Sequence, residues 1–212
     1  MKKLSKQIFD LLISSLAILF LLPVFAVIAA AIKLGSKGPV LFRQERVGKG
    51  GKPFVFYKFR TMKIDVDPFG PSPKSDKDHR LTKTGRFLRE NSLDELPQLF
   101  NILRGDMSLV GPRPLYVSQM AEWNERQKNR LLVKPGLTGL AQISGRGQLT
   151  REEKLELDVK YVETAGLGLD CKIILATIAQ VFGRKNIYEK KYSHTEHTRG
   201  EGETKSKVND EG

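Results

Sequence analysis

The 212-residue chain has 40% hydrophobic residues and a formal charge of +12, which suits one folded domain with short additions. The tail from Lys185 to Gly212 holds six basic and six acidic residues, so the positive excess belongs to residues 1–184 and favours an anionic partner: a nucleic acid, a phosphorylated substrate or an anionic lipid surface. The single cysteine, Cys171, excludes an internal disulfide and a cysteine-rich metal site.

The first predicted element is an apolar run from Leu11 to Ile32, 22 residues without a charge and long enough to cross a bilayer. It could be a signal peptide, a straight transmembrane helix, or a re-entrant helix that enters and leaves on the same side. Its length and the basic body that follows argue against a signal peptide. Basic residues such as Lys6 and Lys33 flank both ends, and positive flanks mark the cytoplasmic side. Pro23, at the middle of the run, predicts a break, so we favour a re-entrant helix over residues 1–34.

Two short strands, 40–46 and 53–60, follow this run and are joined by a glycine-rich turn over 48–52. This pattern predicts a small β-hairpin. Period-two alternation places Lys58 and Arg60 on one face of the second strand. That basic face could be a solvated edge or the wall of an anion site.

Two adjacent carboxylates, Asp94 and Glu95, stand in an otherwise uncharged stretch from Asn91 to Asn101. Ser92 with Glu95 fits a capping box, but Pro97 would then fall inside the helix and remove a needed N–H. We therefore expect Asp94 to be the N-cap, with Pro97 in the first turn. This start would place Asp94 at the positive end of a helix, where phosphate also binds. The two carboxylates could carry chemistry on a bound anion, or they could only cap the helix.

The rest of the chain predicts a helix over 116–132, a loop over 133–143 and helices over 152–162 and 169–182. The last helix is too short to span a bilayer and could be a core helix or an interfacial one. The tail over 185–212 is polar and charge-balanced, which predicts disorder.

Two further charged residues are candidates for a site. Arg146 stands between two glycines and is free to project toward an anion, although a plain surface turn explains it equally well. Asp158, on the predicted helix over 152–162, is a possible partner for a nearby arginine.

The chain resembles the small monotopic phosphoglycosyl transferases, the bacterial sugar transferase family that begins polyprenyl-linked glycans. The matching segments are residues 57–62, 92–101, 105–114, 134–139 with 141–142, and 156–158 followed by Tyr161. The similarity runs from about Lys6 to Arg184, and only the tail lies outside it.

For the fold, the resemblance implies a helix-rich α+β protein with a re-entrant membrane helix, a small β-hairpin and interfacial amphipathic helices. The helix would be broken at Pro23, although Leu22 stands where the family usually has serine. The catalytic domain, residues 35–184, would lie as a monotopic protein on the cytoplasmic face of the bacterial inner membrane. Membrane lipids are therefore expected partners.

For the activity, the resemblance implies transfer of a sugar 1-phosphate from a UDP-sugar to undecaprenyl phosphate, with release of UMP and a requirement for Mg²⁺. Asp94 falls on the family's nucleophile and Glu95 on its assisting residue, and we expect both to bind the metal and Asp94 to be ionised. The expected phosphate-binding residues are Lys58, Arg60, Arg89, Arg113, Arg146 and Asp158.

Two other functions compete with this one. A membrane-tethered nucleic-acid-binding module would explain the basic charge, but the sequence has no helix-turn-helix, RRM or zinc-finger pattern, so we expect no nucleic-acid partner. A non-catalytic membrane scaffold would explain Asp94 and Glu95 as helix caps only.

Overall fold

The computed structural model describes residues 3–66, 73 and 75–183, with the side chains of Lys3, Arg146 and Phe182 excepted. The predicted disordered tail, 185–212, lies outside the described residues. The helices are α1 (Lys3–Gly35), α2 (Lys83–Glu90), α3 (Gln98–Leu103), α4 (Glu125–Lys128), α5 (Leu140–Ile143), α6 (Arg151–Thr164) and α7 (Leu167–Gly183). The strands are β1 (Leu41–Val47), β2 (Pro53–Phe59), β3 (Ser108–Val110) and β4 (Gly136–Thr138). The 3₁₀ turns are η1 (Lys49–Gly51), η2 (Leu93–Glu95), η3 (Val117–Glu122), η4 (Asn129–Leu132) and η5 (Arg146–Gln148). The fold is thus helix-rich α+β, as predicted, and α6 and α7 confirm the helices predicted over 152–162 and 169–182.

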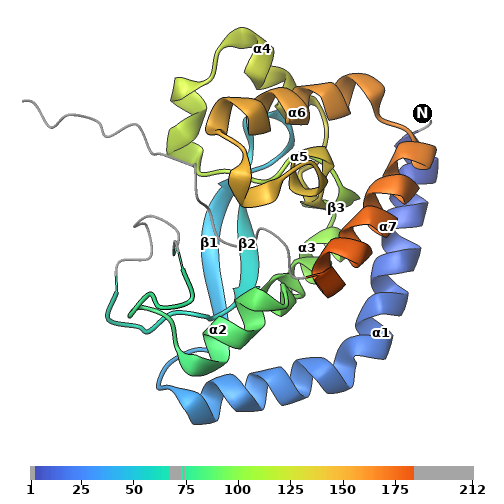
Figure 1. Ribbon diagram of the computed structural model, residues 1–212. Helices are drawn as coiled ribbons and strands as arrows, with labels where there is room; N and C mark the ends of the chain where they lie inside the picture. Colours follow the sequence, from blue (N-terminus) through green and yellow to red (C-terminus); the bar gives the residue numbers. More distant parts are fainter. Residues whose placement is uncertain (1–2, 67–72, 74, 184–212) are drawn as a thin grey trace, which may run out of the picture.

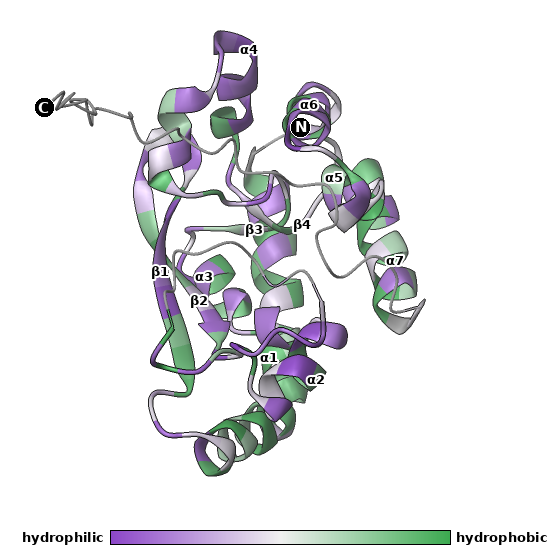
Figure 2. Ribbon diagram, turned by 60° about the vertical axis from the view of Figure 1, so that its left-hand side comes forward, coloured by the Kyte–Doolittle hydropathy of each residue, from purple (hydrophilic) through white to green (hydrophobic). Residues whose placement is uncertain are grey.

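The long helix α1 bends into two arms that lie along the body of the molecule (Figure 1). Pro23 lies inside this helix, and its missing N–H is an ordinary cause of such a bend. Residues Leu4–Gly35 are long and apolar enough to cross a membrane by length and composition. Large apolar side chains such as Leu19 and Phe20 are exposed, and Figure 2 shows the apolar colour along much of the helix. An apolar surface of this extent fits a lipid environment.

The predicted β-hairpin is confirmed. β1 and β2 pair antiparallel, with Leu41 opposite Phe59 and Val47 opposite Pro53. Phe56 of β2 is buried in the main core, whereas Phe59 packs in a second cluster with residues of α1 and α2. Strand β2 is therefore fixed on both sides of Tyr57 and Lys58, which holds these two residues in a defined place.

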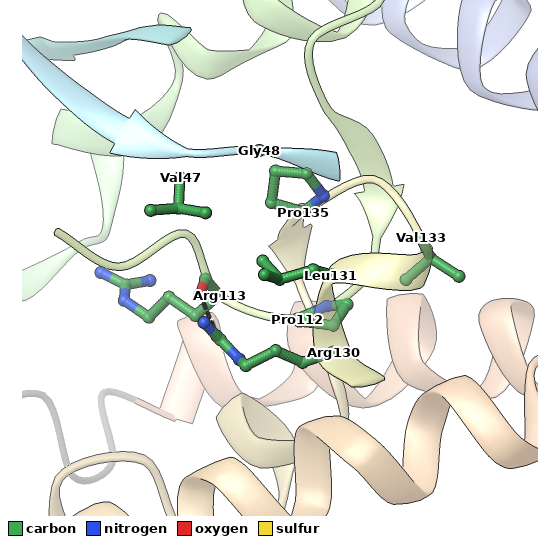
Figure 3. A pocket seen from close by; sticks show the side chains of 8 residues that line it. All are labelled: Val47, Gly48, Pro112, Arg113, Arg130, Leu131, Val133 and Pro135. Atoms are coloured by element: carbon green, nitrogen blue, oxygen red, sulfur yellow. Dashed lines mark hydrogen bonds between the residues drawn. The ribbon is translucent and has the colours of Figure 1, made fainter. Parts of the chain in front are cut away.

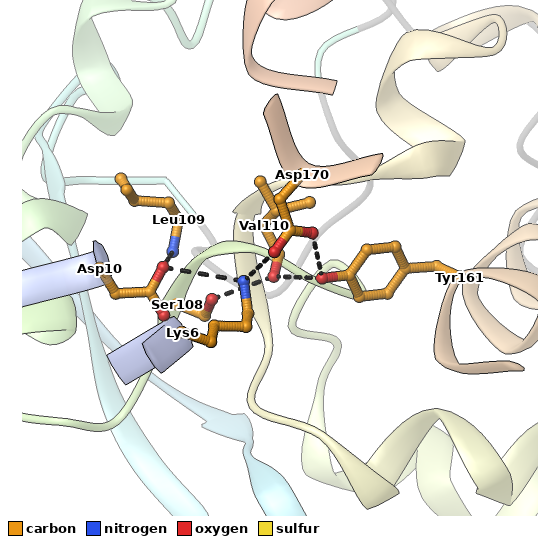
Figure 4. A network of polar contacts seen from close by, with 7 residues as sticks. All are labelled: Lys6, Asp10, Ser108, Leu109, Val110, Tyr161 and Asp170. Carbon is orange, nitrogen blue, oxygen red and sulfur yellow. Dashed lines mark hydrogen bonds and ion pairs between the residues drawn. The ribbon is translucent and has the colours of Figure 1, made fainter. Parts of the chain in front are cut away.

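A buried polar network attaches the N-terminal arm of α1 to the body (Figure 4). The Lys6 ammonium lies 2.7 Å from the Asp170 carboxylate of α7. The Tyr161 hydroxyl donates hydrogen bonds to Asp170 at 2.7 Å and to the Val110 carbonyl at 3.0 Å. Burial and the hydrogen bond to Asp170 raise the pKa of Tyr161, so it stays a neutral donor. Asp10 of α1 accepts a hydrogen bond from a backbone amide of β3 at 3.2 Å.

The predicted single helix over 116–132 is wrong. The chain instead forms η3, α4 and η4, because Trp123 is extended, with φ −85° and ψ 134°. Its side chain is buried beside Val47 and Leu155. Asn124 then caps a new helix, accepting a hydrogen bond from the Gln127 amide at 2.9 Å.

The interpretation of 133–143 as a loop is also wrong. β4 pairs in parallel with β3, and α5 follows it directly. The two backbones approach so closely that a Cβ on Gly136 would lie 2.1 Å from the Gly111 nitrogen. Glycine is therefore required at this position. Because glycine is uncommon in strands, the sequence pattern did not predict β4.

Candidate active site

Asp94 and Glu95 lie in the short turn η2, before α3. Helix α3 begins at Gln98, with Pro97 at its N-cap position, so the prediction that Asp94 is the N-cap is wrong. The capping box of Ser92 is absent too, because Ser92 makes no side-chain cap hydrogen bond. Ser92 is left-handed, with φ 56° and ψ 19°, and this conformation turns the chain out of α2 into a separate turn.

Two cations from distant parts of the chain hold Glu95. The Lys58 ammonium of β2 lies 3.0 Å from Glu95 Oε1, and the Arg113 Nη2 lies 2.7 Å from the same oxygen. Burial favours a raised pKa for Glu95, but the charges and hydrogen bonds of Arg113 and Lys58 outweigh it and hold the pKa well below its ordinary value. Burial lowers the pKa of Lys58, although both carboxylates oppose that change.

The neighbouring Asp94 is in a different state. Its side chain is buried, and it accepts no hydrogen bond from any residue that the structure describes. Burial raises its pKa and outweighs the attraction of Lys58, while the charge of Glu95 raises the pKa further. The helix start that was expected to favour ionisation of Asp94 lies elsewhere, at Gln98, and Glu95 takes the direct bonds of the cations. That Asp94 is ionised stays a prediction.

The backbone of Arg113 is held by a buried ion pair between Arg130 and Asp158. The Arg130 guanidinium donates a hydrogen bond to the Arg113 carbonyl and lies 2.7 Å from Asp158 Oδ2 (Figure 3 shows the two arginines). It also stacks on Trp123, 4.7 Å from the ring centre. Asp158 therefore has the arginine partner that the sequence suggested. Its contact is with Arg130, which holds the Arg113 backbone, and not with Asp94 or Glu95. Burial raises the pKa of Asp158 and outweighs the effect of Arg130.

The cavity beside this ion pair is small. It has a volume of about 10 Å³, at the lower limit for one water molecule, and Pro112 and Pro135 lie in its wall. Its lining includes neither Asp94 nor Glu95. This cavity is therefore a feature of the packing behind Arg113 and not a substrate pocket.

The other predicted phosphate ligands have different places. Arg60 is buried and donates hydrogen bonds to the carbonyls of Ser36 and Lys37, where α1 ends, because helix ends attract cations. The structure thus does not bring Arg60 to the carboxylates. Arg89 of α2 lies close enough to lower the pKa of Asp94, although burial has the larger, opposite effect. The side chain of Arg146 lies outside the described residues.

Sequence analysis missed Asn101, which is 0% exposed. Its side chain accepts a hydrogen bond from the Tyr57 amide at 3.1 Å and donates one to the Val55 carbonyl at 2.7 Å. It thereby fastens β2 to α3 next to Lys58. An asparagine in an otherwise apolar helical segment could have indicated a contact with another segment, because a buried amide needs hydrogen-bond partners.

The arrangement combines several cations, a carboxylate that they hold, and a buried carboxylate that accepts no hydrogen bond from the described residues. Cations at this spacing suit a phosphate group, and arginine's planar fork suits it best. Among the described residues, no group of three or more His, Cys, Asp or Glu side chains could hold a metal ion. Two adjacent carboxylates nevertheless fit Mg²⁺, which commonly keeps waters and substrate phosphates as its other ligands.

Comparison with known proteins agrees with this chemistry. A family model described as bacterial sugar transferase matches residues 1–184. The uncharacterized sugar transferase EpsL of Bacillus subtilis is 44% identical over 203 residues, which cover 96% of each protein. The UDP-glucose:undecaprenyl-phosphate glucose-1-phosphate transferase of Klebsiella pneumoniae is 44% identical over 191 residues, covering 86% of this chain and 41% of that protein. The protein of the same name from Caulobacter vibrioides is 42% identical over 198 residues, covering 87% of this chain and 72% of that protein. The chain thus spans nearly all of the Bacillus relative but under half of the Klebsiella one.

Proposed function

The chain belongs to the bacterial sugar transferase family, and we propose that it transfers a sugar 1-phosphate from a UDP-sugar to undecaprenyl phosphate, releasing UMP. The names of the Klebsiella and Caulobacter relatives support this acceptor and this reaction class. The observation that carries the proposal is the contrast between Asp94 and Glu95. Two cations occupy Glu95, whereas Asp94 accepts no hydrogen bond within the described residues and is open to a covalent role.

In the first step, an Asp94 carboxylate oxygen attacks the phosphorus that carries the sugar. The bond from that phosphorus to the bridging oxygen breaks, and UMP leaves with the electron pair. The product is an acyl phosphate between Asp94 and the sugar phosphate. Arg113 and Lys58 are placed to offset negative charge on the donor diphosphate as this step proceeds.

In the second step, an oxygen of undecaprenyl phosphate attacks the same phosphorus. The bond to Asp94 breaks, the carboxylate is restored, and the sugar is joined to the lipid by a diphosphate. Asp94 is thus the nucleophile of the first half-reaction and the leaving group of the second. Glu95 binds Arg113 and Lys58 and would thereby keep both cations close to Asp94 in both steps.

Magnesium is part of this proposal. Its ligands would be Asp94 first, because that buried carboxylate accepts no hydrogen bond from the part of the chain that the structure describes, and Glu95 second, because Lys58 and Arg113 already hold it. When bound, the ion would offset the charge of the donor diphosphate and of Asp94.

The position of the protein at the membrane is also a proposal. We infer that α1 is re-entrant, since basic residues flank both of its ends and it bends into two arms. The exposed Leu175 and Ile178 of α7 would lie at the interface. This arrangement holds the site on the cytoplasmic face, at the depth of the acceptor's phosphate.

The test is UMP release by detergent-solubilised protein from a panel of UDP-sugars, with Mg²⁺ and with or without undecaprenyl phosphate. We expect one donor to give UMP, and we expect chelation of Mg²⁺ to stop the release. No UMP from any donor under these conditions would count against the transferase function.

A further inference from the structure

A second cavity lies away from the carboxylates, between α1 and the end of α3. Its volume is about 140 Å³, and its walls include Leu11, Leu103 and Met107. Two charged residues, Asp10 and Lys134, also line this cavity. The cavity is large enough for a phosphate group with its substituents, and nothing in the proposed sugar transfer uses it.

Lys134 is the cation that gives this cavity its charge. Its side chain is half-buried, and it makes no hydrogen bond or ion pair with any residue that the structure describes. A Cβ on Gly105 would lie 3.5 Å from the Lys134 ammonium, which places the charge in the cavity wall, just after α3. A partly buried ammonium without a partner attracts an anion.

Asp10 does not cancel this charge, because it already has partners. Its carboxylate lies 3.7 Å from the Lys6 ammonium and accepts a hydrogen bond from the Leu109 amide (Figure 4). Lys134 therefore stays the uncompensated charge of the cavity.

An apolar stripe leads away from the cavity along α1. Leu4, Ile8 and Leu11 are spaced by four and three residues, so they share one face of the helix, and all three are exposed. Leu11 belongs both to this stripe and to the cavity wall, and Leu103 is exposed at the same wall. A ligand with a phosphate and long acyl chains would place its phosphate at Lys134 and its chains against the exposed Leu11 and Leu103.

We propose that this cavity binds the headgroup phosphate of a glycerophospholipid. Undecaprenyl phosphate offers the same chemistry, but its phosphate must reach Asp94. The cavity lies beside the C-terminal end of α3, whereas Asp94 lies in η2, before the N-terminal end of that helix. The site is therefore a second lipid site that fixes the depth of α1 and α3 in the headgroup layer. It does not depend on sugar transfer.

The test measures retained lipid on the full-length protein. Protein reconstituted in phosphatidylethanolamine and phosphatidylglycerol is extracted with mild detergent, and native mass spectrometry counts the bound lipid. We expect Lys134→Met to lower the retained phospholipid about fivefold. Leu103→Trp should lower it similarly without a change of charge, because the ring narrows the cavity. Lys160→Met, at an exposed lysine on α6, is the matched control and should retain the lipid.

Three results would overturn the proposal. Equal retention in all variants would show that the cavity does not bind the lipid. Retention of undecaprenyl phosphate alone, when both lipids are supplied, would make the cavity an acceptor subsite. Displacement of the phospholipid by inorganic phosphate would make free phosphate the ligand. UMP release is measured in parallel, so a protein that keeps its lipid but releases no UMP counts only against the transferase function.

Discussion

The Arg113 guanidinium and the Glu95 carboxylate lie 2.7 Å apart, although the two residues are 18 positions apart in the chain. This ion pair joins the loop after β3 to the turn η2. Lys58 approaches the same carboxylate from β2. Three separate segments thus converge on Glu95, and the adjacent Asp94 keeps a buried carboxylate that accepts no hydrogen bond from the described residues.

Replacing Arg113 tests the role of this pair. Arg113→Lys should lower the rate of UMP release about a hundredfold, because lysine cannot present two parallel N–H groups to a carboxylate or phosphate. The free energy of unfolding should change by less than about 1 kcal/mol, because the Arg113 side chain is 42% exposed. Arg104→Lys is the control, because Arg104 bonds the Tyr57 hydroxyl and not Glu95. Equal losses in the two variants would contradict the role given to Arg113.

The buried pair of Arg130 and Asp158 should contribute mainly to stability. Asp158→Ala should lower the free energy of unfolding by about 3–5 kcal/mol, because it leaves the Arg130 charge buried without a counter-charge. The double variant Arg130→Met with Asp158→Leu should recover much of that loss. Urea denaturation followed by tryptophan fluorescence measures both. Glu156→Ala, in an exposed pair with Arg126, is the control and should cost less than about 1 kcal/mol. A double variant no more stable than Asp158→Ala would argue against this explanation.

Asn101 should matter for both stability and activity. Asn101→Ala leaves the Val55 carbonyl and the Tyr57 amide without their side-chain partner, at a cost of about 1–3 kcal/mol for each group. UMP release should fall as well, because Lys58 follows Tyr57 in the same strand. Thermal unfolding and UMP release measure the two effects. Asn91→Ala, which removes only a hydrogen bond to the Phe87 carbonyl near the surface, should change neither strongly.

Pro23 should determine the topology of α1. Pro23→Ala restores a backbone donor, so the helix should straighten toward a form that spans the bilayer. Labelling of a cysteine placed at Lys2, with Cys171 changed to serine, reports the side of the N-terminus. We expect cytoplasmic labelling in the parent and periplasmic labelling in the Pro23→Ala variant. Periplasmic labelling of the parent would show that α1 is not re-entrant.

Local patterns were sufficient to predict much of this fold. The apolar run predicted the long helix, the glycine-rich turn predicted the hairpin of β1 and β2, and the spacing of apolar residues predicted α6 and α7. Each of these depends on neighbours in the sequence. The helix over 116–132 failed because burial of Trp123 against Val47 and Leu155, distant in sequence, interrupts it.

The structure brings Lys58 and Arg113 to the adjacent carboxylates, but the geometry around Asp94 differs from the prediction. The adjacent carboxylates and nearby cations pointed to Asp94, Glu95, Lys58 and Arg113. The left-handed Ser92 moved the start of α3 away from Asp94, and no sequence rule favours serine in that conformation. Arg60 was misplaced because the end of α1, far back in the chain, offers it free carbonyls.

The central claim is that Asp94 carries the phosphosugar, and intact-protein mass spectrometry tests it most directly. The protein is incubated with Mg²⁺ and the UDP-sugar that yields UMP, without undecaprenyl phosphate, and is then quenched. We predict a mass increase of one sugar phosphate that maps to Asp94, disappears when undecaprenyl phosphate is added, and is absent in Asp94→Asn. Asp94→Asn protein that still releases UMP at a comparable rate, or an adduct on another residue, would contradict the account.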